Sequence, residues 1–567
     1  MKETLEKEIK SFLEKKGIKN PKVRLTPSVY LDKGDYSTNV AMAYAKELRN
    51  KPIDLAEEIT LRLTQGDLLK QIKIRVVAPG FINFSFDKEY FGDVVKDILK
   101  DSEYGKNEHA KGYKVFIEHT QPNPFKTFHI GHLMNNTIGE SVARIVKANG
   151  AEVQTATYHG DVGLHVAKAV WALKQGISIK EAYAFGHKAY EDDEKAKREI
   201  TKINTKIYDE SDPEINKIYE GGRQESVEYF EKLYEKLDNH FDYHFFESES
   251  GEVGKELVLE NVGKVFEKGV KGAVIFKGEN FEPKTHTRVF LNSEGLPTYE
   301  AKELGLAQIK KDWFSYDMSI TVTANEQDSF FKVVEVAIGE VFPDLKGKLT
   351  HLSHGLLKLP TGKMSSREGN IISAEALIQQ TQDRVLEKMW DSGQLHKDID
   401  DTQKVILAEQ IAIGAIKYSI LRQAIGGDII FDFDKSISFE GDSGPYLQYS
   451  AVRAKSVLKK SEKEFHKGDP FVKSETKLPS EWETTNLERY LERFPDIVAR
   501  AGMEYAPHHI ATYLIELAGE FNSFYASHKI IDVEDKSSSY RLAITKVFVQ
   551  VMASGLNLLG IKIPEKM

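Results

Sequence analysis

The chain has 567 residues, a length that predicts roughly three to five domains of about 100 to 200 residues each. Hydrophobic residues make up 41% and charged residues 29%, a balance that indicates packed domains and argues against a disordered protein. The 78 Lys and Arg residues against 87 Asp and Glu give a net charge of −9, so a nucleic-acid partner requires local basic patches. Two segments are locally basic, Lys2 to Arg24 and Arg453 to Lys477, although solvated helix surface explains them equally well.

The sequence also excludes several kinds of protein and of site. No stretch approaches 18 uninterrupted apolar residues, which excludes a membrane span. The absence of cysteine excludes disulfides, thiolate zinc sites, iron–sulfur clusters and cysteine nucleophiles; zinc held by His and carboxylates stays open, but there is no HExxH. Met1 to Lys16 is charged and has no apolar core, so it is not a secretory signal, and we expect a cytoplasmic protein.

Residues 1 to about 105 predict a small α+β domain. A hairpin is indicated where two alternating apolar and polar runs flank Pro79-Gly80. The expected helices are Thr4–Lys16, Ala41–Asn50 and Leu55–Leu63, and the expected strands are Ile72–Val77 and Phe81–Phe86.

From about residue 111 the pattern changes to a strand, a helix and a returning strand. We expect a buried strand at Tyr113–Glu118, a helix at His129–Gly150 and a second strand at Glu152–Tyr158. This βαβ unit predicts the start of a doubly wound parallel sheet.

The rest of the chain is mainly helical. Residues 175 to 285 are charged and aromatic-rich and predict a helical insertion; strands are expected again at Thr287–Leu291, Ser319–Val322 and His351–Leu357. From about 375 onward helices dominate, and a helix beginning at Pro507 has one apolar face that we expect to be packing: Ile510, Leu514, Leu517, Phe521 and Phe524.

The strongest local motif is PNPFKTFHIGH at Pro122–His132. His129 and His132 lie at the expected N-terminus of a helix, where unpaired backbone N–H groups and the helix dipole favour an anion. Two imidazoles three residues apart share a helix face and can both donate to phosphate oxygens, and Gly131 leaves room for an adenine ring. Taken alone, the motif also fits two surface histidines at a helix cap.

A second motif, GKMSSREGN, spans Gly362–Asn370. It is polar, basic and flanked by glycine, so Lys363 and Arg367 could reach a pyrophosphate from a loop. An ordinary surface loop explains the second motif alone as well.

The two motifs in this order, on a split βαβ fold, resemble the HIGH and KMSKS elements of class I aminoacyl-tRNA synthetases. The pairing suits adenylate formation, in which a carboxylate attacks the ATP α-phosphate and the enzyme positions the reactants and neutralises charge. The resemblance implies catalytic roles for His129, His132, Lys363 and Arg367, and ATP contacts by His129, Gly131, His132, Lys363, Met364 and Ser365.

Along most of its length the chain resembles the arginyl-tRNA synthetases. The similar segments are GDYSTNVAM, APGFINFSF, IEHTQPNPFKTFHIGHLMN, LPTYEAKELGLA, SFEGDSGPYLQYSAVRA and the C-terminal LNLLGIKIPEKM. By this resemblance the arginine-binding residues are Glu118, Asn123, Tyr299, Glu303 and Gln327. Arginine is a planar, permanently charged fork, and a pocket for it needs carboxylate acceptors and an aromatic plane, which agrees with this set.

The chain departs from that family at several positions. Glu303 stands where Asp is usual, and Met134 stands where a polar residue is common. GDVGLHV replaces a frequent GDWGTQF, which leaves the roles of Asp161 and His165 open. Lys126 adds a cation three residues before His129 and is expected to be catalytic or auxiliary beside Lys363.

The resemblance implies a multidomain α/β enzyme with three parts: a tRNA-contacting domain (1–105), a catalytic domain (106–375) with a helical insertion (about 175–285), and a helical anticodon-binding domain (376–567). It implies an arginine–tRNA ligase that uses ATP with Mg²⁺, has no zinc or organic cofactor and no metal held by the protein, and charges the 2′-hydroxyl of the terminal adenosine of tRNA(Arg). It also implies tRNA-dependent activation, a monomer, and neither DNA nor membrane as a partner. Two alternatives stay open: another HxGH nucleotidylyl transferase, such as a pantothenate-synthetase-like ligase, and a catalytically silent tRNA-binding paralogue.

Overall fold

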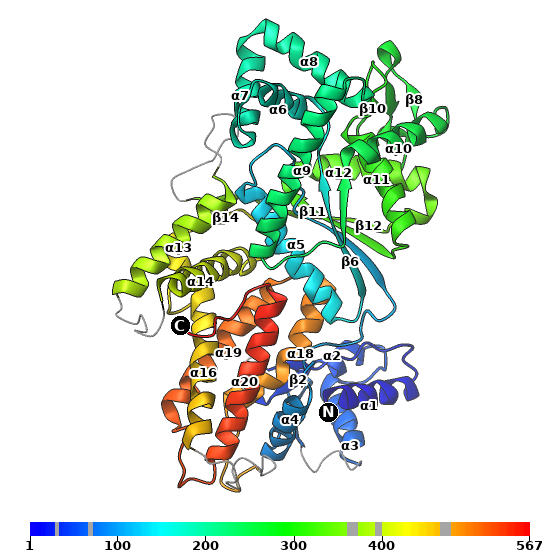
Figure 1. Cartoon of the computed structure of the whole chain (residues 1–567). Coiled ribbons are helices and arrows are strands. Elements are labelled where there is room, and N and C mark those ends of the chain that lie inside the picture. Colours follow the sequence, from blue (N-terminus) through cyan, green and yellow to red (C-terminus); the bar gives the residue numbers. More distant parts are fainter. Residues whose placement is uncertain (29–32, 66–71, 360–371, 392–399, 465–477) are drawn as a thin grey trace. The chain divides into compact units, whose positions relative to one another are not determined.

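The structure is a computed structural model that describes residues 1–28, 33–65, 72–359, 372–391, 400–464 and 478–567 (Figure 1). These residues form two compact units. The first comprises Met1–Tyr104, Arg453–Asp496 and Glu516–Met552, and the second comprises Gly105–Val452, Ile497–Ile515 and Ala553–Met567. The C-terminal helices therefore contribute residues to both units.

The first unit contains an antiparallel sheet with strand order β1-β2-β4-β3. Its strands are β1 (Thr26–Pro27), β2 (Tyr36–Thr38), β3 (Ile72–Val77) and β4 (Phe81–Phe86), and its N-terminal helices are α1 (Lys2–Lys15), α2 (Val40–Tyr44), α3 (Pro52–Thr64) and α4 (Lys88–Lys100). The predicted β3–β4 hairpin is confirmed. The predicted helix at 41–50 is wrong in extent: α2 ends at Tyr44, and the residues after it form turns in which Arg49 takes a left-handed φ of 50°.

The second unit is built on a five-stranded parallel sheet with the order β12-β11-β5-β6-β7. Its strands are β5 (Lys114–Glu118), β6 (Glu152–His159), β7 (Tyr243–Phe246), β11 (Met318–Ala324) and β12 (Leu349–His354). The predicted βαβ unit is confirmed as β5, α5 (Ile130–Ala148) and β6. The strand order reverses at β5, and in open parallel sheets ligands bind beyond the carboxyl ends of the strands at such a reversal. Glu118 ends β5 there.

Helices cover both faces of this sheet (Figure 1). α5 packs on one face, against β5, β6 and β11. The other face carries α10 (Glu247–Glu260), α11 (Tyr299–Trp313) and α12 (Asp328–Val341). Because side chains alternate along a strand, Phe116 and Glu118 point to the same face, and Phe116 joins the core formed with α11. Glu118 is thereby directed toward α11.

The segment from 175 to 285 also contains sheet. Its helices follow α6 (Leu164–Lys174) and are α7 (Ile179–Asp192), α8 (Glu194–Asp209) and α9 (Pro213–Lys236). β7 lies within this segment and pairs with β6, so the segment supplies the edge strand of the parallel sheet. A separate antiparallel sheet contains β8 (Glu267–Lys268), β9 (Val274–Phe276) and β10 (Arg288–Leu291); single 3₁₀ turns lie at η3 (Val270–Gly272), η4 (Gly278–Asn280), η5 (Asn325–Gln327) and η6 (Pro343–Leu345).

The single strand predicted at His351–Leu357 is wrong. β12 ends at His354, and a separate β13 (Leu357–Lys358) pairs in parallel with β14 (Ile429–Ile430). Gly355 lies so close to the backbone at Gly427 that an added Cβ would meet it at 2.3 Å, which explains why only glycine fits at the break.

The predicted helical region from about residue 375 onward is confirmed. Its helices are α13 (Ala374–Asp391), α14 (Asp401–Leu421), α15 (Phe433–Ser436), α16 (Gly444–Glu464), α18 (Asn486–Glu504), α19 (His508–Ser527) and α20 (Ser538–Leu558). The five residues of the predicted apolar face lie on α19 and are all buried. Among the helices of the described residues, none is long and apolar enough to cross a membrane.

Candidate functional site

The N-terminus of α5 is closed by its own histidines. Nδ1 of His129 accepts hydrogen bonds from the backbone N–H of Gly131 (3.1 Å) and of His132 (3.4 Å), and Nδ1 of His132 accepts from the backbone N–H of His129 at 3.2 Å. The two rings are parallel, with centroids 3.6 Å apart. Since both Nδ1 atoms are acceptors, each neutral ring carries its proton on Nε2. Both rings can therefore donate an Nε2–H to a ligand.

This geometry differs from the expected one in two respects. The backbone N–H groups predicted to bind an anion are already used by the rings. The space above Gly131 holds the His129 ring, since a Cβ on Gly131 would meet its Cε1 at 2.9 Å. Glycine is needed at this position so that the His129 ring can fold over the helix end, and the ring nitrogens replace the backbone as donors.

Both histidines are uncharged at neutral pH. Burial, followed by the positive charge of Lys126, lowers the pKa of His129 to about 4. Burial and the neighbouring His129 and Lys126 hold the pKa of His132 well below its usual range. A phosphate at this site would thus meet neutral N–H donors and one nearby ammonium group.

The second motif lies outside the described residues, so the positions of Lys363, Met364, Ser365 and Arg367 are not given by the structure. The chain directly after it is fixed to the first motif. The backbone N–H of Ile130 donates to the carbonyl of Ile372 (3.3 Å), and the N–H of Ala374 donates to the carbonyl of Phe128 (2.9 Å). The chain therefore resumes beside His129 two residues after the segment that carries Lys363.

Lys126 is one of the residues that line a cavity of about 320 Å³ between the 122–128 loop and α9. Its ammonium group lies 4.7 Å from the centre of the Tyr183 ring on α7, and burial lowers its pKa. The charge of Lys126 influences both His129 and His132. The structure thus brings Lys126, His129 and His132 into one electrostatic neighbourhood.

Glu118 is fully buried at the end of β5 and is already paired. It forms an ion pair with Lys310 of α11, and its Oε1 accepts a hydrogen bond of 2.8 Å from Gln121. Lys310 was not among the predicted residues. It lies seven residues after Glu303 on the same helix, a spacing that places both on one helix face, so helical periodicity was the available signal.

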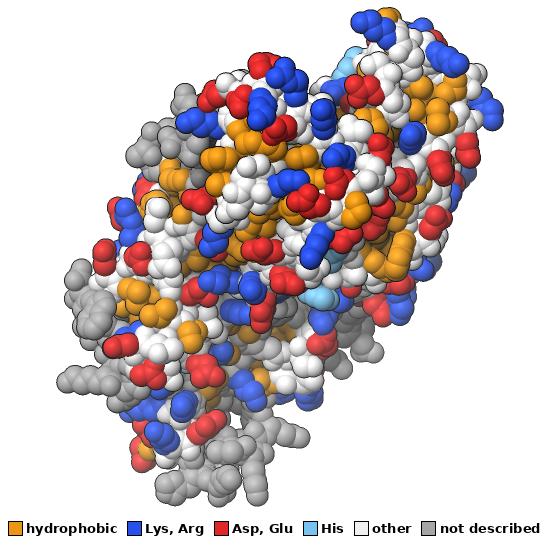
Figure 2. All heavy atoms as spheres, turned by 45° about the horizontal axis from the view of Figure 1, so that its top comes forward, with side chains coloured by type: hydrophobic (Ala, Val, Ile, Leu, Met, Phe, Trp, Pro, Cys, Tyr) orange, Lys and Arg blue, Asp and Glu red, His pale blue; other side chains and the backbone are white. Residues whose placement is uncertain are grey.

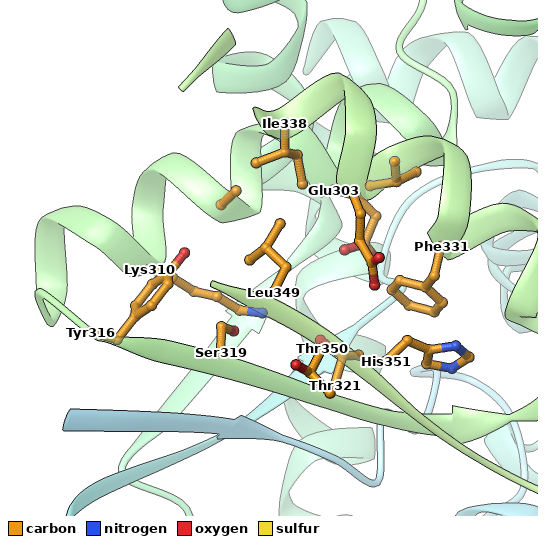
Figure 3. Close-up of a pocket in the computed structure, with 13 residues that line it drawn as sticks. Glu303, Lys310, Tyr316, Ser319, Thr321, Phe331, Ile338, Leu349, Thr350 and His351 are labelled. Carbon is orange, nitrogen blue, oxygen red and sulfur yellow. The ribbon is translucent and has the colours of Figure 1, made fainter. Parts of the chain in front are cut away.

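Glu303 points into a cavity of about 30 Å³ between α11, α12, β11 and β12 (Figure 3). Among the described residues no hydrogen bond or ion pair reaches its carboxyl group. Burial, and then the negative charge of Glu118, raise the pKa of Glu303 to about 8. The cavity holds roughly two water molecules, so it must widen to receive a larger cationic group. An unpaired buried carboxyl beside a second carboxylate is an arrangement that a cation would stabilise.

Asn123 lies where β6 ends. Its Oδ1 accepts from the backbone N–H of Gly160 at 3.2 Å, and a Cβ on Gly160 would meet that oxygen at 2.5 Å. The same Cβ would lie 3.1 Å from Oε1 of Glu247, a buried carboxylate paired with Lys302 at 2.6 Å. Asn123 and this ion pair, which sequence reasoning missed, therefore flank the same glycine.

The structure does not bring Tyr299 and Gln327 to the Glu303 cavity. Tyr299 is 60% exposed and lines a separate cavity of about 470 Å³ together with Lys302 and His165. Its ring centre lies 5.3 Å from the ammonium group of Lys302. Gln327 ends η5 and is exposed. The family resemblance implies that Tyr299 lies against the guanidinium and that Gln327 contacts the α-amino end; in this structure neither residue lines the cavity of Glu303.

Asp161 and His165, whose roles the sequence left open, are internally satisfied. Asp161 is fully buried and accepts hydrogen bonds from the backbone and hydroxyl of Ser248 (2.9 and 2.8 Å) and from the Tyr219 hydroxyl (3.0 Å). It also forms an ion pair with Arg223, whose Nε lies 3.1 Å away. Nε2 of His165 donates to the Gly160 carbonyl at 2.9 Å, and burial lowers the pKa of His165 to about 3. Both residues brace the turn after β6.

Three family descriptions together match most of the chain. "Arginyl tRNA synthetase N terminal domain" matches residues 1–86, "tRNA synthetases class I (R), catalytic domain" matches 94–433, and "DALR anticodon binding domain" matches 447–567. Among curated proteins, the "Arginine--tRNA ligase" of Treponema denticola is 31% identical over 92% of this chain and 91% of its own length. That of Flavobacterium psychrophilum is 29% identical over 91% and 90%.

Solved structures agree in fold. The Thermus thermophilus arginyl-tRNA synthetase has a TM-score of 0.75 at 23% identity and matches all of both chains. The Plasmodium falciparum arginyl-tRNA synthetase has a TM-score of 0.78 at 20% identity, covering 100% of this chain and 99% of its own. At these identities the likeness establishes the fold, namely a parallel-sheet catalytic domain between an N-terminal domain and a helical C-terminal domain.

Proposed function

Because this chain belongs to the class I arginyl-tRNA synthetase family, we propose that it activates L-arginine with ATP and transfers the arginyl group to the 2′-hydroxyl of the terminal adenosine of tRNA(Arg). Products of the first step are arginyl-adenylate and pyrophosphate. The observation that carries the proposal is the pair of neutral Nε2–H donors at the N-terminus of α5, beside which the chain returns from the KMSKS-like segment. Such preorganised donors stabilise charge that develops on phosphate oxygens.

We assign the roles as follows. His129 and His132 donate to the phosphates of ATP, and Lys126, Lys363 and Arg367 supply positive charge from two sides. Mg²⁺ enters as part of the ATP substrate. Glu118 and Glu303 bind the guanidinium group, and Asn123 and Gln327 bind the α-amino end. Tyr299 would cover the guanidinium only after its exposed ring moves inward.

We also propose domain boundaries at 1–105, 106–375 and 376–567, a monomeric enzyme and a cytoplasmic location. The family match at the C-terminus supports anticodon recognition by the helical domain. On the face drawn in Figure 2, Lys and Arg side chains are interspersed with Asp and Glu, consistent with the overall negative charge. tRNA binding therefore depends on local groups of basic residues.

ATP–pyrophosphate exchange tests the function directly. Measured across the twenty amino acids, exchange is expected with arginine only, and only when tRNA is present. Exchange with another amino acid would refute the substrate assignment. Robust exchange without tRNA would refute the coupling to tRNA and leave the substrate intact. No exchange with any amino acid, with or without tRNA, would favour the silent paralogue.

The basic end of α16 is expected to contact tRNA. Lys455, Lys459, Lys460 and Lys463 are all exposed there. tRNA affinity should fall steeply with salt, since each phosphate contact releases counterions, and replacing one contacting lysine by alanine should reduce the slope of log K against log salt by about one. Filter binding at several salt concentrations measures this. Affinity that does not change with salt, or full charging by a chain ending near Ile372, would contradict the role of the helical domain.

Arginine affinity is expected to depend on pH through Glu303. Since its pKa is about 8 in the empty site, the group is mostly protonated at pH 6.5 and must lose the proton to bind a guanidinium. The dissociation constant for arginine should then fall by roughly 15-fold between pH 6.5 and pH 8, as the ionised fraction rises. Calorimetric titration at each pH measures it. Glu303→Gln should show a flat profile, and a flat profile in the unmodified enzyme would contradict the assignment.

A further inference from the structure

A chain of hydrogen-bonding groups leads from the loop before α5 to the surface of the second unit. His159 ends β6 and is fully buried, and its Nδ1 lies 2.7 Å from the carbonyl oxygen of Pro122. Its Nε2 lies 3.3 Å from Nδ1 of His244 on β7. Nε2 of His244 in turn lies 3.1 Å from Oε1 of Glu231 on α9, whose side chain is 49% exposed.

The carbonyl of Pro122 and the carboxylate of Glu231 are acceptors, and they determine which group donates in each hydrogen bond of this series. A carbonyl oxygen only accepts, so Nδ1 of His159 carries a proton and, in the neutral ring, Nε2 is left as the acceptor. Nδ1 of His244 must then donate to it. A carboxylate also only accepts, so the contact with Glu231 becomes a hydrogen bond when Nε2 of His244 carries a proton as well. Burial lowers the pKa of His244 and the Glu231 carboxylate opposes this, so the neutral ring, with its proton on Nδ1, is the form that donates to His159.

The surrounding elements hold both rings in place. Strand pairing sets the two histidines close together, because His244 is opposite Thr157, two residues before His159. The ring of His159 is stacked against Phe230 at 5.8 Å and Phe246 at 5.3 Å. A buried ring between two aromatic side chains keeps one orientation, so its hydrogen bond to the Pro122 carbonyl is directed rather than incidental.

The loop between β5 and α5, which includes Pro122, has an unusual backbone conformation that hydrogen bonds from neighbouring elements stabilise. Three of its residues have positive φ angles that non-glycine residues rarely adopt: Thr120 (79°), Gln121 (49°) and Phe125 (65°). Two bonds from the end of β6 restrain the loop between them. One is the His159 bond to Pro122, and the other is the bond from Gly160 to the side chain of Asn123.

We propose that His244, acting through His159, is a positioning residue for arginine activation. It fixes the tautomer of His159, which orients the Pro122–Asn123 peptide so that the Asn123 side chain meets the α-amino group of the substrate. This role rests on the proposed function, since it takes Asn123 as a substrate contact. Neither histidine touches ATP or arginine in this scheme.

Three variants test the role in the full-length protein, with tRNA present. His244→Phe keeps the ring but removes its donors, and we expect the KM for arginine to rise about tenfold with the KM for ATP within about twofold. His244→Asn places an amide donor where Nδ1 stands and should recover most of the arginine affinity. His240→Phe, an exposed histidine in the loop before β7, is the matched control and should change neither constant.

Glu231→Ala removes the exposed end of the chain without altering the core, and it should raise the KM for arginine by about threefold even if His244→Phe lowers the melting temperature. If the KM for arginine is unchanged in His244→Phe and in Glu231→Ala, the positioning role of His244 is overturned. Equal rises in the KM for arginine and ATP, or no recovery in His244→Asn, also overturn it, since these outcomes indicate a packing role. An unmodified enzyme without arginine-dependent exchange refutes the proposed function itself, which separates the two failures.

Discussion

Replacing His132 by alanine is expected to slow arginine activation by about 100- to 1000-fold while the affinity for arginine changes little, because a preorganised donor to the transition-state phosphate is lost. In the structure, Nδ1 of His132 is occupied by the backbone of His129, so its Nε2–H is the free donor. His132→Gln should retain part of the activity, since the Gln amide lies near the position of Nε2. His109→Ala, at an exposed histidine, is the control and should have no effect.

The lysines are expected to rank in a defined order in the same exchange assay. Lys363→Ala should cause a loss comparable to that of His132→Ala, and Lys126→Ala a smaller one, because Lys126 is partly engaged with the Tyr183 ring. The reverse order would make Lys126 the main cation. An unaltered rate in His132→Ala would refute the assignment of the HIGH motif.

Sequence periodicity was sufficient for several elements, including the βαβ unit on which part of the site is built. The alternation in β3 and β4, the βαβ unit of β5, α5 and β6, and the apolar face of α19 are local patterns that burial enforces on each element separately. The break at Gly355 was not visible, because it depends on the close approach of Gly427, 72 positions further along the chain.

At the site, the features that the sequence did not predict are contacts between residues that are far apart in the chain, together with side-chain orientations. Glu118 and Glu303 were predicted as site residues by the family resemblance, but the Lys310 partner of Glu118 depends on how α11 docks on the sheet. The capping of α5 by its own histidines depends on ring orientation, which a motif does not encode. The role of Asp161 stayed open in the sequence because its three hydrogen bonds and its ion pair come from α9 and α10, which are distant in the chain.

Replacing Glu303 by glutamine is expected to raise the KM for arginine, leave that for ATP near its original value, and narrow the preference for arginine over citrulline. Citrulline has nearly the same shape but no positive charge, and a site built of carboxylate acceptors discriminates against such an analogue by roughly 10⁴-fold. Glu303 is the carboxyl group without a partner among the described residues of this site, whereas Glu118 is neutralised by Lys310. Measuring kcat/KM for both substrates in both proteins decides the matter.

Glu335→Gln is the matched control, because Glu335 lines the same small cavity and burial also raises its pKa. If only Glu303→Gln narrows the preference, Glu303 binds the guanidinium and the longer side chain has kept the role that Asp has in the family. If Glu335→Gln narrows the preference for arginine over citrulline instead, the guanidinium is bound by Glu335 on α12. If neither does, Glu118 must leave Lys310 to bind the substrate, because Asp161 is already saturated by Ser248, Tyr219 and Arg223. Lys310→Met should then tighten arginine binding by freeing that carboxylate.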